Sequence, residues 1–188
     1  MRSTSFSQFW NSRFSGSLPL MYLLREEKRD QWVRFYSLPE GKRYPFDERE
    51  EEEILKRYNS VAGFVFDDNE PVWLVANTGV HRSETRHVLK LLAMDFKSTG
   101  VKSYTDADGD KCKSRFFYKQ DHWKSGAFND LFSLTIHEKI SGILFVNQKA
   151  QLFYAYDGGM DVILSGANQL DHIKHQFEQW RSPLLSGL

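Results

Sequence analysis

The sequence predicts an α+β protein in which a mostly antiparallel sheet, built from hairpins, packs against about five helices. Short apolar runs recur in pairs separated by polar turns, and other segments carry apolar residues at helical spacing. The regular alternation of strand and helix that marks a parallel α/β sheet is missing. No repeat of about 20 to 50 residues and no Pro/Gly/Ser-rich linker divides the chain. We therefore expect residues 1–188 to form a single globular domain.

The N-terminal segment predicts one helix and one β-hairpin. Within residues 3–15, four aromatic residues repeat at the spacing of a single helical face: Phe6, Phe9, Trp10 and Phe14. Gly16 and Pro19 end that helix, because both residues disfavour its continuation. The apolar runs Leu20–Arg25 and Trp32–Tyr36, which a charged turn separates, then predict the two arms of a hairpin.

The middle of the chain predicts a long helix, a buried strand and a second helix. Asp47–Phe66 carries its apolar residues on one helical stripe. Its opening run of carboxylates is either a solvated first turn, stabilised by the helix dipole, or an acidic docking patch. Val72–Ala76 has the length of a buried strand, and after Ser83 the apolar residues through Phe96 return to helical spacing.

The second half predicts hairpins separated by single helices. A hairpin over Lys102–Trp123 has an acidic tip at Asp106–Asp110, and a helix follows from Phe128 to Lys139. Three further apolar runs predict strands, the first two as a pair: Ile143–Val146, Leu152–Tyr156 and Val162–Leu164. The last helix places four apolar residues on one face: Leu170, Ile173, Phe177 and Trp180.

Composition argues against several classes of function. Lys and Arg total 25, as do Asp and Glu, so the chain lacks the basic excess typical of nucleic-acid-binding proteins. Its apolar runs are far shorter than the ~20 residues of a membrane-spanning helix, and residues 1–15 do not resemble an export signal. The lone Cys112 cannot form an internal disulfide and is expected to be a structural or incidental residue. We therefore expect a cytoplasmic protein with no nucleic-acid or membrane partner.

Two features resemble metal sites, but each has a simpler explanation. The tip Asp106–Asp110 has alternate carboxylates, yet Lys111 and Phe117 occupy the Gly and Glu positions of a calcium loop. His172 and His175 are three residues apart, whereas zinc-enzyme helices space their histidines by about four. No phosphate-binding glycine loop, nucleophile elbow or dinucleotide fingerprint occurs in the sequence. The sequence thus predicts no catalytic residue, no cofactor and no metal, and an enzyme is the less favoured class.

Two segments are candidate binding sites. The first, at residues 32–45, gathers basic and aromatic side chains around a strand-to-helix turn: Arg34, Lys42, Arg43 and Tyr44. It either binds an anion or an acidic partner, or its cations pair with the glutamates downstream. The second, at residues 153–163, contains a Gly-Gly turn between two aspartates. It is either a structural turn or a site that presents three polar groups: Tyr156, Asp157 and Asp161.

The same segments resemble a known family. The text W-V-R-F-Y-S-L-P-E-G-K-R-Y-P at 32–45, followed by I-L-K-R-Y-N at 54–59, resembles the bacterial domain-of-unknown-function family DUF3885. The C-terminal text resembles that family's Tyr-Asp-Asp-Arg-Gly-x-Asp turn, which precedes apolar residues and a closing helix that ends near a Trp. Here the turn at 156–161 reads Y-D-G-G-M-D, one residue shorter and without the second Asp and the Arg. The resemblance leaves residues 80–123 unmatched and implies a bacterial, intracellular protein with no assigned activity, and the missing Arg favours a structural turn.

The leading functional hypothesis is a non-enzymatic protein-binding module, by analogy an immunity or inhibitor partner in bacterial competition. It rests on small size, the lack of a catalytic motif, an aromatic share of 15% and concentrated acidic and basic stretches. The alternative is a small enzyme, or a binder of a small ligand or anion, with a pocket between Arg34, Arg43 and the Tyr156–Asp161 turn. That alternative requires the two segments to lie side by side. A third possibility, an assembly subunit, requires a large exposed apolar patch.

Overall fold

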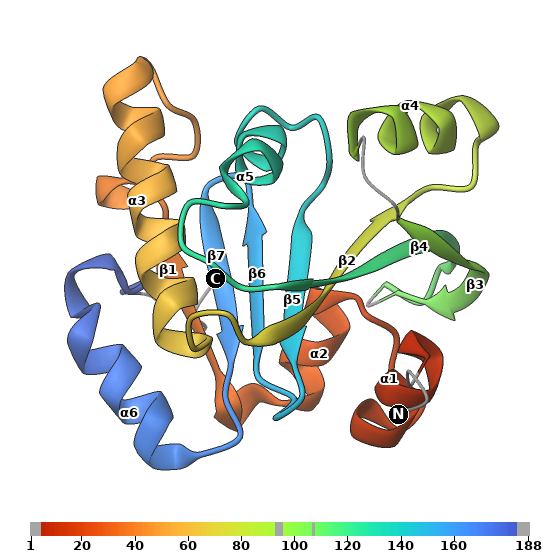
Figure 1. Cartoon of the computed structure of the whole chain (residues 1–188), viewed down its shortest axis with the longest axis horizontal. Helices are drawn as coiled ribbons and strands as arrows, with labels where there is room; N and C mark the ends of the chain where they lie inside the picture. The colour runs from red at the N-terminus through yellow and green to blue at the C-terminus, as the bar shows by residue number, and fades with distance from the viewer. Residues whose placement is uncertain (1–4, 93–95, 107, 184–188) are drawn as a thin grey trace.

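The computed structural model describes residues 5–92, 96–106 and 108–183, and it confirms the α+β class. Seven strands in those residues form one antiparallel sheet, in the order β1-β7-β6-β5-β2-β4-β3 (Figure 1). They are β1 (Trp32–Tyr36), β2 (Pro71–Thr78), β3 (Lys97–Thr105), β4 (Lys111–His122), β5 (Ile143–Asn147), β6 (Leu152–Tyr156) and β7 (Gly159–Ile163). The pairs β3–β4, β5–β6 and β6–β7 are hairpins, and the first two confirm the hairpins predicted for the second half.

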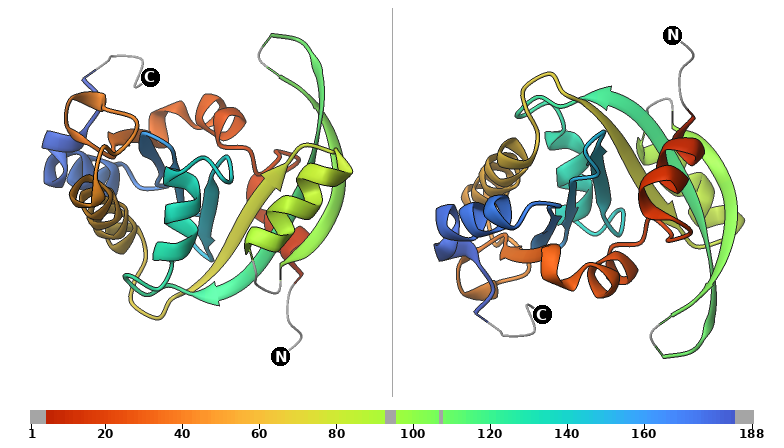
Figure 2. Two further views of the ribbon diagram at one scale, coloured as in Figure 1. Left: turned by 90° about the horizontal axis from the view of Figure 1, so that it is seen from above. Right: turned by 90° about the horizontal axis from the view of Figure 1, so that it is seen from below.

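Helices cover both faces of the sheet. The α-helices in the described residues are α1 (Phe6–Phe14), α2 (Met21–Glu27), α3 (Glu48–Val65), α4 (Arg82–Leu92), α5 (Asn129–Ile136) and α6 (Ala167–Gln176). Buried side chains of α3, α4, α5 and α6 pack on one face, and those of α1 and α2 pack on the other (Figure 2). The sheet is therefore the middle of three layers. None of these helices is long and apolar enough to cross a bilayer.

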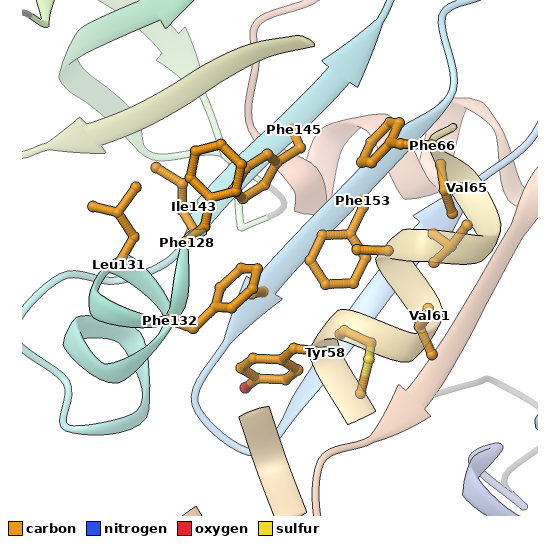
Figure 3. Close-up of a cluster of buried hydrophobic side chains, with 14 of the residues drawn as sticks. Tyr58, Val61, Val65, Phe66, Phe128, Leu131, Phe132, Ile143, Phe145 and Phe153 are labelled. Carbon is orange, nitrogen blue, oxygen red and sulfur yellow. The ribbon is translucent and has the colours of Figure 1, made fainter. Parts of the chain in front are cut away.

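An aromatic core lies between the sheet and helices α3 and α5 (Figure 3). The ring of Phe132 on α5 lies 5.7 Å from that of Phe145 on β5 and 6.0 Å from that of Phe153 on β6. Tyr58 of α3 completes the group, 5.3 Å from Phe132 and edge-on to it. Each such pair contributes about 0.5–1.5 kcal/mol beyond its buried area. Tyr58 also donates its hydroxyl hydrogen bond to the carbonyl of Tyr156, which fastens α3 to the end of β6.

Helix α1 has the aromatic face that its spacing predicts. Ser5 caps it and exchanges hydrogen bonds with Gln8, the reciprocal arrangement of a capping box. The ring of Phe6 lies 5.5 Å from Trp73 on β2 and 5.0 Å from Tyr118 on β4. Helix α1 is therefore held against the sheet by aromatic contacts. Residues 3 and 4 of the expected helix lie outside the described residues.

The predicted strand at Leu20–Arg25 is wrong, because these residues belong to helix α2 and the turn that precedes it. Met21 and Leu24, three residues apart, are both buried in the core under α1 and α2. Leu, Met, Arg and Glu all have high helix propensity, and the run lacks the alternation of a half-buried strand. Strand β1 forms where expected, but its partner in the sheet is β7.

The remaining predictions differ from the structure mainly at their ends. Helix α3 begins after Asp47, whose side chain accepts a hydrogen bond from the backbone N–H of Glu50. Helix α4 is described as far as Leu92; residues 93–95 of the expected helix lie outside the described residues, and Phe96 at its expected end is not helical. Helix α5 ends at Ile136, three residues before the predicted end at Lys139.

The acidic tip of the β3–β4 hairpin is a turn. Strand β4 pairs with β2 only from Arg115 onward, so the tip projects beyond β2 (Figure 2). There the Oδ1 atom of Asp106 accepts hydrogen bonds from the backbone N–H of Asp108 at 3.1 Å and of Asp110 at 2.8 Å. The expected turn chemistry of aspartate explains these contacts. Ala107 of the predicted tip lies outside the described residues.

The outer edges of the two edge strands, β1 and β3, differ in what they contact. The outer side of β1 meets the C-terminal segment, where the backbone N–H of Ser182 donates to the carbonyl of Arg34 at 3.2 Å. An isolated bridge between Phe35 and Arg181 adds to this contact. At the opposite end, β3 is the last strand among those described, and a bulge between Ser98 and Gly100 interrupts its pairing with β4.

Candidate functional site

The pairing of β1 with β7 brings the two candidate segments together. Arg34 lies directly opposite Asp161, although 127 residues separate them in the chain. On the other side of β7, Asp161 lies opposite Tyr154 of β6. Paired positions point to the same face of a sheet, so all three side chains lie on the face that α2 partly covers. The structure thus meets the requirement that the two segments lie side by side.

Arg34 and Asp161 form a buried, two-pronged ion pair. Nε of Arg34 donates to Oδ1 of Asp161 at 2.8 Å, and Nη2 donates to Oδ2 at 3.0 Å. The two side chains are only 13% and 2% exposed. Burial disfavours the charge on Arg34, but the hydrogen bonds and the negative charge of Asp161 outweigh burial and raise the pKa of Arg34. The guanidinium of Arg34 therefore keeps its charge, and the two parallel hydrogen bonds fix the geometry of the pair.

Aromatic rings hold the guanidinium of Arg34 in place. Its central carbon lies 5.3 Å from the ring centre of Trp32 and 5.4 Å from that of Tyr156. The ring of Tyr156 stacks in turn on that of Tyr154, 5.6 Å away. Gly159 makes room for this arrangement, because a Cβ atom there would lie 2.9 Å from the hydroxyl of Tyr156. The row of rings and the ion pair form one rigid surface.

A cavity of about 310 Å³ lies above this surface, between α2 and the sheet. Four tyrosines contribute to its lining: Tyr22, Tyr104, Tyr154 and Tyr156. Four charged residues also line it: Arg25, Arg34, Asp157 and Asp161. The cavity therefore combines flat aromatic walls with a small number of charged groups, which is the usual composition of a ligand site.

Three tyrosines of the cavity have raised pKa values and remain neutral: Tyr22, Tyr154 and Tyr156. Burial raises the pKa of Tyr154 and of Tyr156, and the nearby charge of Asp161 adds to the shift in both. Burial also raises the pKa of Tyr22. The described residues that line the cavity include no His or Cys, and both aspartates are in ion pairs. The lining therefore offers aromatic and hydrogen-bonding surfaces to a ligand.

Residues 42–46, which we call the 42–46 loop, lie next to the turn between β6 and β7. Arg43 forms an ion pair with Asp157 of that turn. The hydroxyl of Tyr44 donates to Oε1 of Glu138 at 3.0 Å. Arg43 also lies 3.6 Å from Glu138, so the loop contacts both the β6–β7 turn and the segment after α5.

The 42–46 loop exposes two aromatic rings. Phe46 is 88% exposed and Tyr44 is 44% exposed, and both are among the few large apolar side chains on the surface of the described residues. Lys42 lies over the ring of Phe46, with Nζ 5.8 Å from the ring centre. An aromatic ring exposed to this extent gains no burial energy from the fold itself, so it is available to a partner.

The structure divides the predicted binding residues between two places. Four of them line the cavity: Arg34, Tyr156, Asp157 and Asp161. Lys42, Arg43 and Tyr44 lie on the 42–46 loop, and Arg43 reaches the cavity rim through its ion pair with Asp157. The expected pairing with the downstream glutamates occurs at Lys42, whose Nζ donates to Oε1 of Glu50 at 2.7 Å.

Sequence patterns did not identify four residues of these two places: Tyr22, Arg25, Phe46 and Tyr104. Because residues 20–25 were predicted to form a strand, the helical face that carries Tyr22 and Arg25 was not recognised. Tyr104 belongs to a correctly predicted hairpin, but its position near α2 depends on the twist of the sheet. Phe46 has one local signal, because it is a large apolar residue between Pro45 and the Asp47 cap, where a loop is expected.

Comparison with known proteins gives one result. The model of the family described as "Domain of unknown function (DUF3885)" matches residues 20–184 of the 188-residue chain. The match includes α2, both candidate segments and the β3–β4 hairpin, so it extends through the residues 80–123 that the resemblance had left unmatched. No significantly similar curated protein or solved structure was found. The chain therefore belongs to the DUF3885 family of domains of unknown function.

Proposed function

We propose that the protein is a non-catalytic protein-binding module and that the 42–46 loop is its recognition surface. The observation that carries this proposal is the exposure of Phe46, at 88%, next to the half-exposed ring of Tyr44. Aromatic side chains are enriched at the centres of protein interfaces and are frequent among the residues that dominate their binding energy. In this proposal Phe46 inserts into an apolar pocket of the partner.

Contacts on both sides fix the 42–46 loop before any partner binds. The carboxylate of Glu50 accepts hydrogen bonds from Nζ of Lys42 at 2.7 Å and from the backbone N–H of Phe46 at 2.6 Å. The ion pair of Arg43 and the hydrogen bond of Tyr44 hold its other side. A loop that is already ordered loses little conformational entropy on binding, so more of the contact energy appears as affinity.

The charges around the 42–46 loop indicate the chemistry of the partner. Lys42 and Arg43 are paired internally, and beside the loop the exposed carboxylates Glu40, Asp47 and Glu48 outnumber the exposed cation Arg49. An acidic rim around an aromatic anchor fits a partner with a basic surface around an apolar pocket. Enzymes that act on nucleic acids have such basic surfaces, and an inhibitor or immunity protein for one of them is the form of binding that we favour.

The experiment compares Phe46→Ala with Leu89→Ala. Both substitutions remove an exposed apolar side chain, but Leu89 lies on α4 and is 40% exposed. The wild-type chain, used as bait in an extract of its native host, is expected to capture a basic protein in stoichiometric amount. Phe46→Ala is expected to weaken that capture by about tenfold or more, whereas Leu89→Ala leaves it unchanged.

The stability of both variants is measured by thermal unfolding, since exposed substitutions of this kind change stability by less than about 0.5 kcal/mol. If wild type captures no protein, or if the two variants capture the partner equally well, the 42–46 loop is not the recognition surface. If the captured partner is acidic, the proposed charge complementarity is wrong.

A further inference from the structure

We propose that the cavity between α2 and the sheet is a binding site for a small aromatic carboxylate. This cavity is distinct from the 42–46 loop, and the inference does not depend on the proposed protein partner. The lining of the cavity defines both the charge and the shape of the ligand. It includes Tyr22 and Arg25 of α2, Tyr104 of β3 and Arg34 of β1.

Arg25 supplies a positive charge that the fold leaves incompletely paired. Its Nε atom is buried and has no hydrogen-bond partner among the described residues. The nearest carboxylate, that of Glu26, lies 3.8 Å away and is 60% exposed, so it compensates the charge only weakly. The Arg25 side chain is 23% exposed and lines the cavity, so an anion bound there compensates its charge more strongly than the exposed Glu26 does.

The other charges of the cavity reinforce the preference for an anion. Asp161 is neutralised by Arg34 and Asp157 by Arg43, which leaves the charge of Arg25 in excess. Arg34 uses Nε and Nη2 in the pair with Asp161, and Nη1 takes part in neither of those hydrogen bonds. Arg25 and Arg34 both line the cavity, so both guanidinium charges act on a ligand bound there. A carboxylate matches the planar geometry of the guanidinium donors.

The walls of the cavity select a flat apolar body next to that carboxylate. Tyr154 and Tyr156 form a stacked pair on one side, and the rings of Tyr22 and Tyr104 lie 6.3 Å apart on the other. The parts of these rings that face the cavity can pack against a further aromatic ring. A volume of about 310 Å³ is at the lower limit for small-molecule sites, so it suits a ligand with one ring.

The test uses three probes on the wild-type protein, with binding measured by isothermal titration calorimetry. Benzoate combines the ring with the negative charge, benzamide keeps the ring without the charge, and acetate keeps the charge without the ring. We expect benzoate to bind with a Kd of about 1 mM or tighter, and the other two probes to bind at least about tenfold more weakly.

Two variants locate the binding site. Arg25→Gln removes the weakly compensated guanidinium and is expected to weaken benzoate binding by about tenfold or more. Arg29→Gln is the matched control, because Arg29 has the same neighbour, Glu26, at 3.8 Å but is 62% exposed and does not line the cavity. It is expected to bind benzoate as the wild type does. Thermal unfolding of both variants establishes that they are folded.

Several results would overturn the inference. They are the absence of benzoate binding at concentrations up to about 10 mM, equal binding of benzoate and benzamide, and equal effects of the two substitutions. The Phe46→Ala variant separates this site from the recognition surface. It is expected to bind benzoate as the wild type does. A negative result for the 42–46 loop therefore leaves the benzoate measurement valid, and a negative benzoate result leaves the test of the 42–46 loop valid.

Discussion

The carboxylate of Asp161 faces the guanidinium of Arg34 across β7 and β1, and two hydrogen bonds of 2.8 and 3.0 Å join them. Replacing Asp161 by Ala leaves a buried, unpaired charge on Arg34. We expect the free energy of unfolding to fall by about 3–5 kcal/mol, measured by urea denaturation. The double variant Arg34→Met with Asp161→Ala removes both charges, so its loss is expected to be smaller. A loss below about 1 kcal/mol for the single variant would contradict this account.

Gly159 and Gly63 provide a matched pair of substitutions. A Cβ atom at Gly159 would lie 2.8 Å from the carbonyl oxygen of Phe35 and 2.9 Å from the hydroxyl of Tyr156, so Gly159→Ala forces the sheet or the ring to move. We expect it to lower the free energy of unfolding by about 1–3 kcal/mol. Gly63 lies in α3 with open space at its Cβ position, and Gly63→Ala is expected to raise stability by about 0.5–1 kcal/mol. Chemical denaturation of the two variants measures both changes.

Glu50 gives the protein an acid-dependent element of stability. The hydrogen bond from Lys42, followed by that from the backbone N–H of Phe46, lowers the pKa of Glu50 below its usual 4.5. A folded-state pKa that is lowered stabilises the protein above the unfolded-state value, and this stabilisation is lost as the pH falls through the folded-state value.

Glu50→Gln is therefore expected to lower the melting temperature at neutral pH and to flatten its decrease below about pH 4.5. The control is Glu52→Gln, because Glu52 is exposed on the same helix and outside the 42–46 loop. Melting curves at a series of pH values test this expectation. Parallel curves for the two variants would show that Glu50 has no special role.

Cys112 is expected to react slowly for a partly exposed thiol. Its Sγ atom donates to Oδ2 of Asp106 at 3.3 Å, and this hydrogen bond, assisted by partial burial, raises the pKa of the thiol. Asp106→Asn removes the negative charge and should lower that pKa, so reaction with a disulfide reagent at pH 8 should become several-fold faster. Asp108→Asn, one charge removed from the same turn, serves as the control. Equal rates for the two variants would exclude Asp106 as the cause.

The sequence correctly predicts the helices and strands whose pattern of buried residues can be recognised within one short segment. The aromatic stripe of α1, the apolar stripe of α3 and the strand pair β5–β6 each depend on residues within one short segment. The error at 20–25 has the same origin, because seven residues are too few to separate one helical face from a buried strand. Propensity favours the helix there, whereas the run of apolar residues favours a strand.

The candidate site could be predicted only in part, because its contacts join distant segments. Arg34 and Asp161 were both identified as candidate residues, yet their pairing depends on the β1–β7 register. The cavity depends further on where α2 and Tyr104 lie relative to the sheet. Such placements follow from sheet twist and packing, which have no signature in a single sequence. The exposure of Phe46 could not be predicted either, because it depends on whether a distant segment packs over that residue.

The bulge in β3 has a consequence for how molecules of this protein behave beside one another. A regular edge strand offers a ladder of open N–H and C=O groups on which a second molecule can assemble. The bulge between Ser98 and Gly100 interrupts the regular spacing of these N–H and C=O groups. The nearby ammonium groups of Lys97 and Lys102 also repel an identical strand. Crowded copies of the protein should therefore resist fibrous aggregation at this border, even though nine residues of β3 line it.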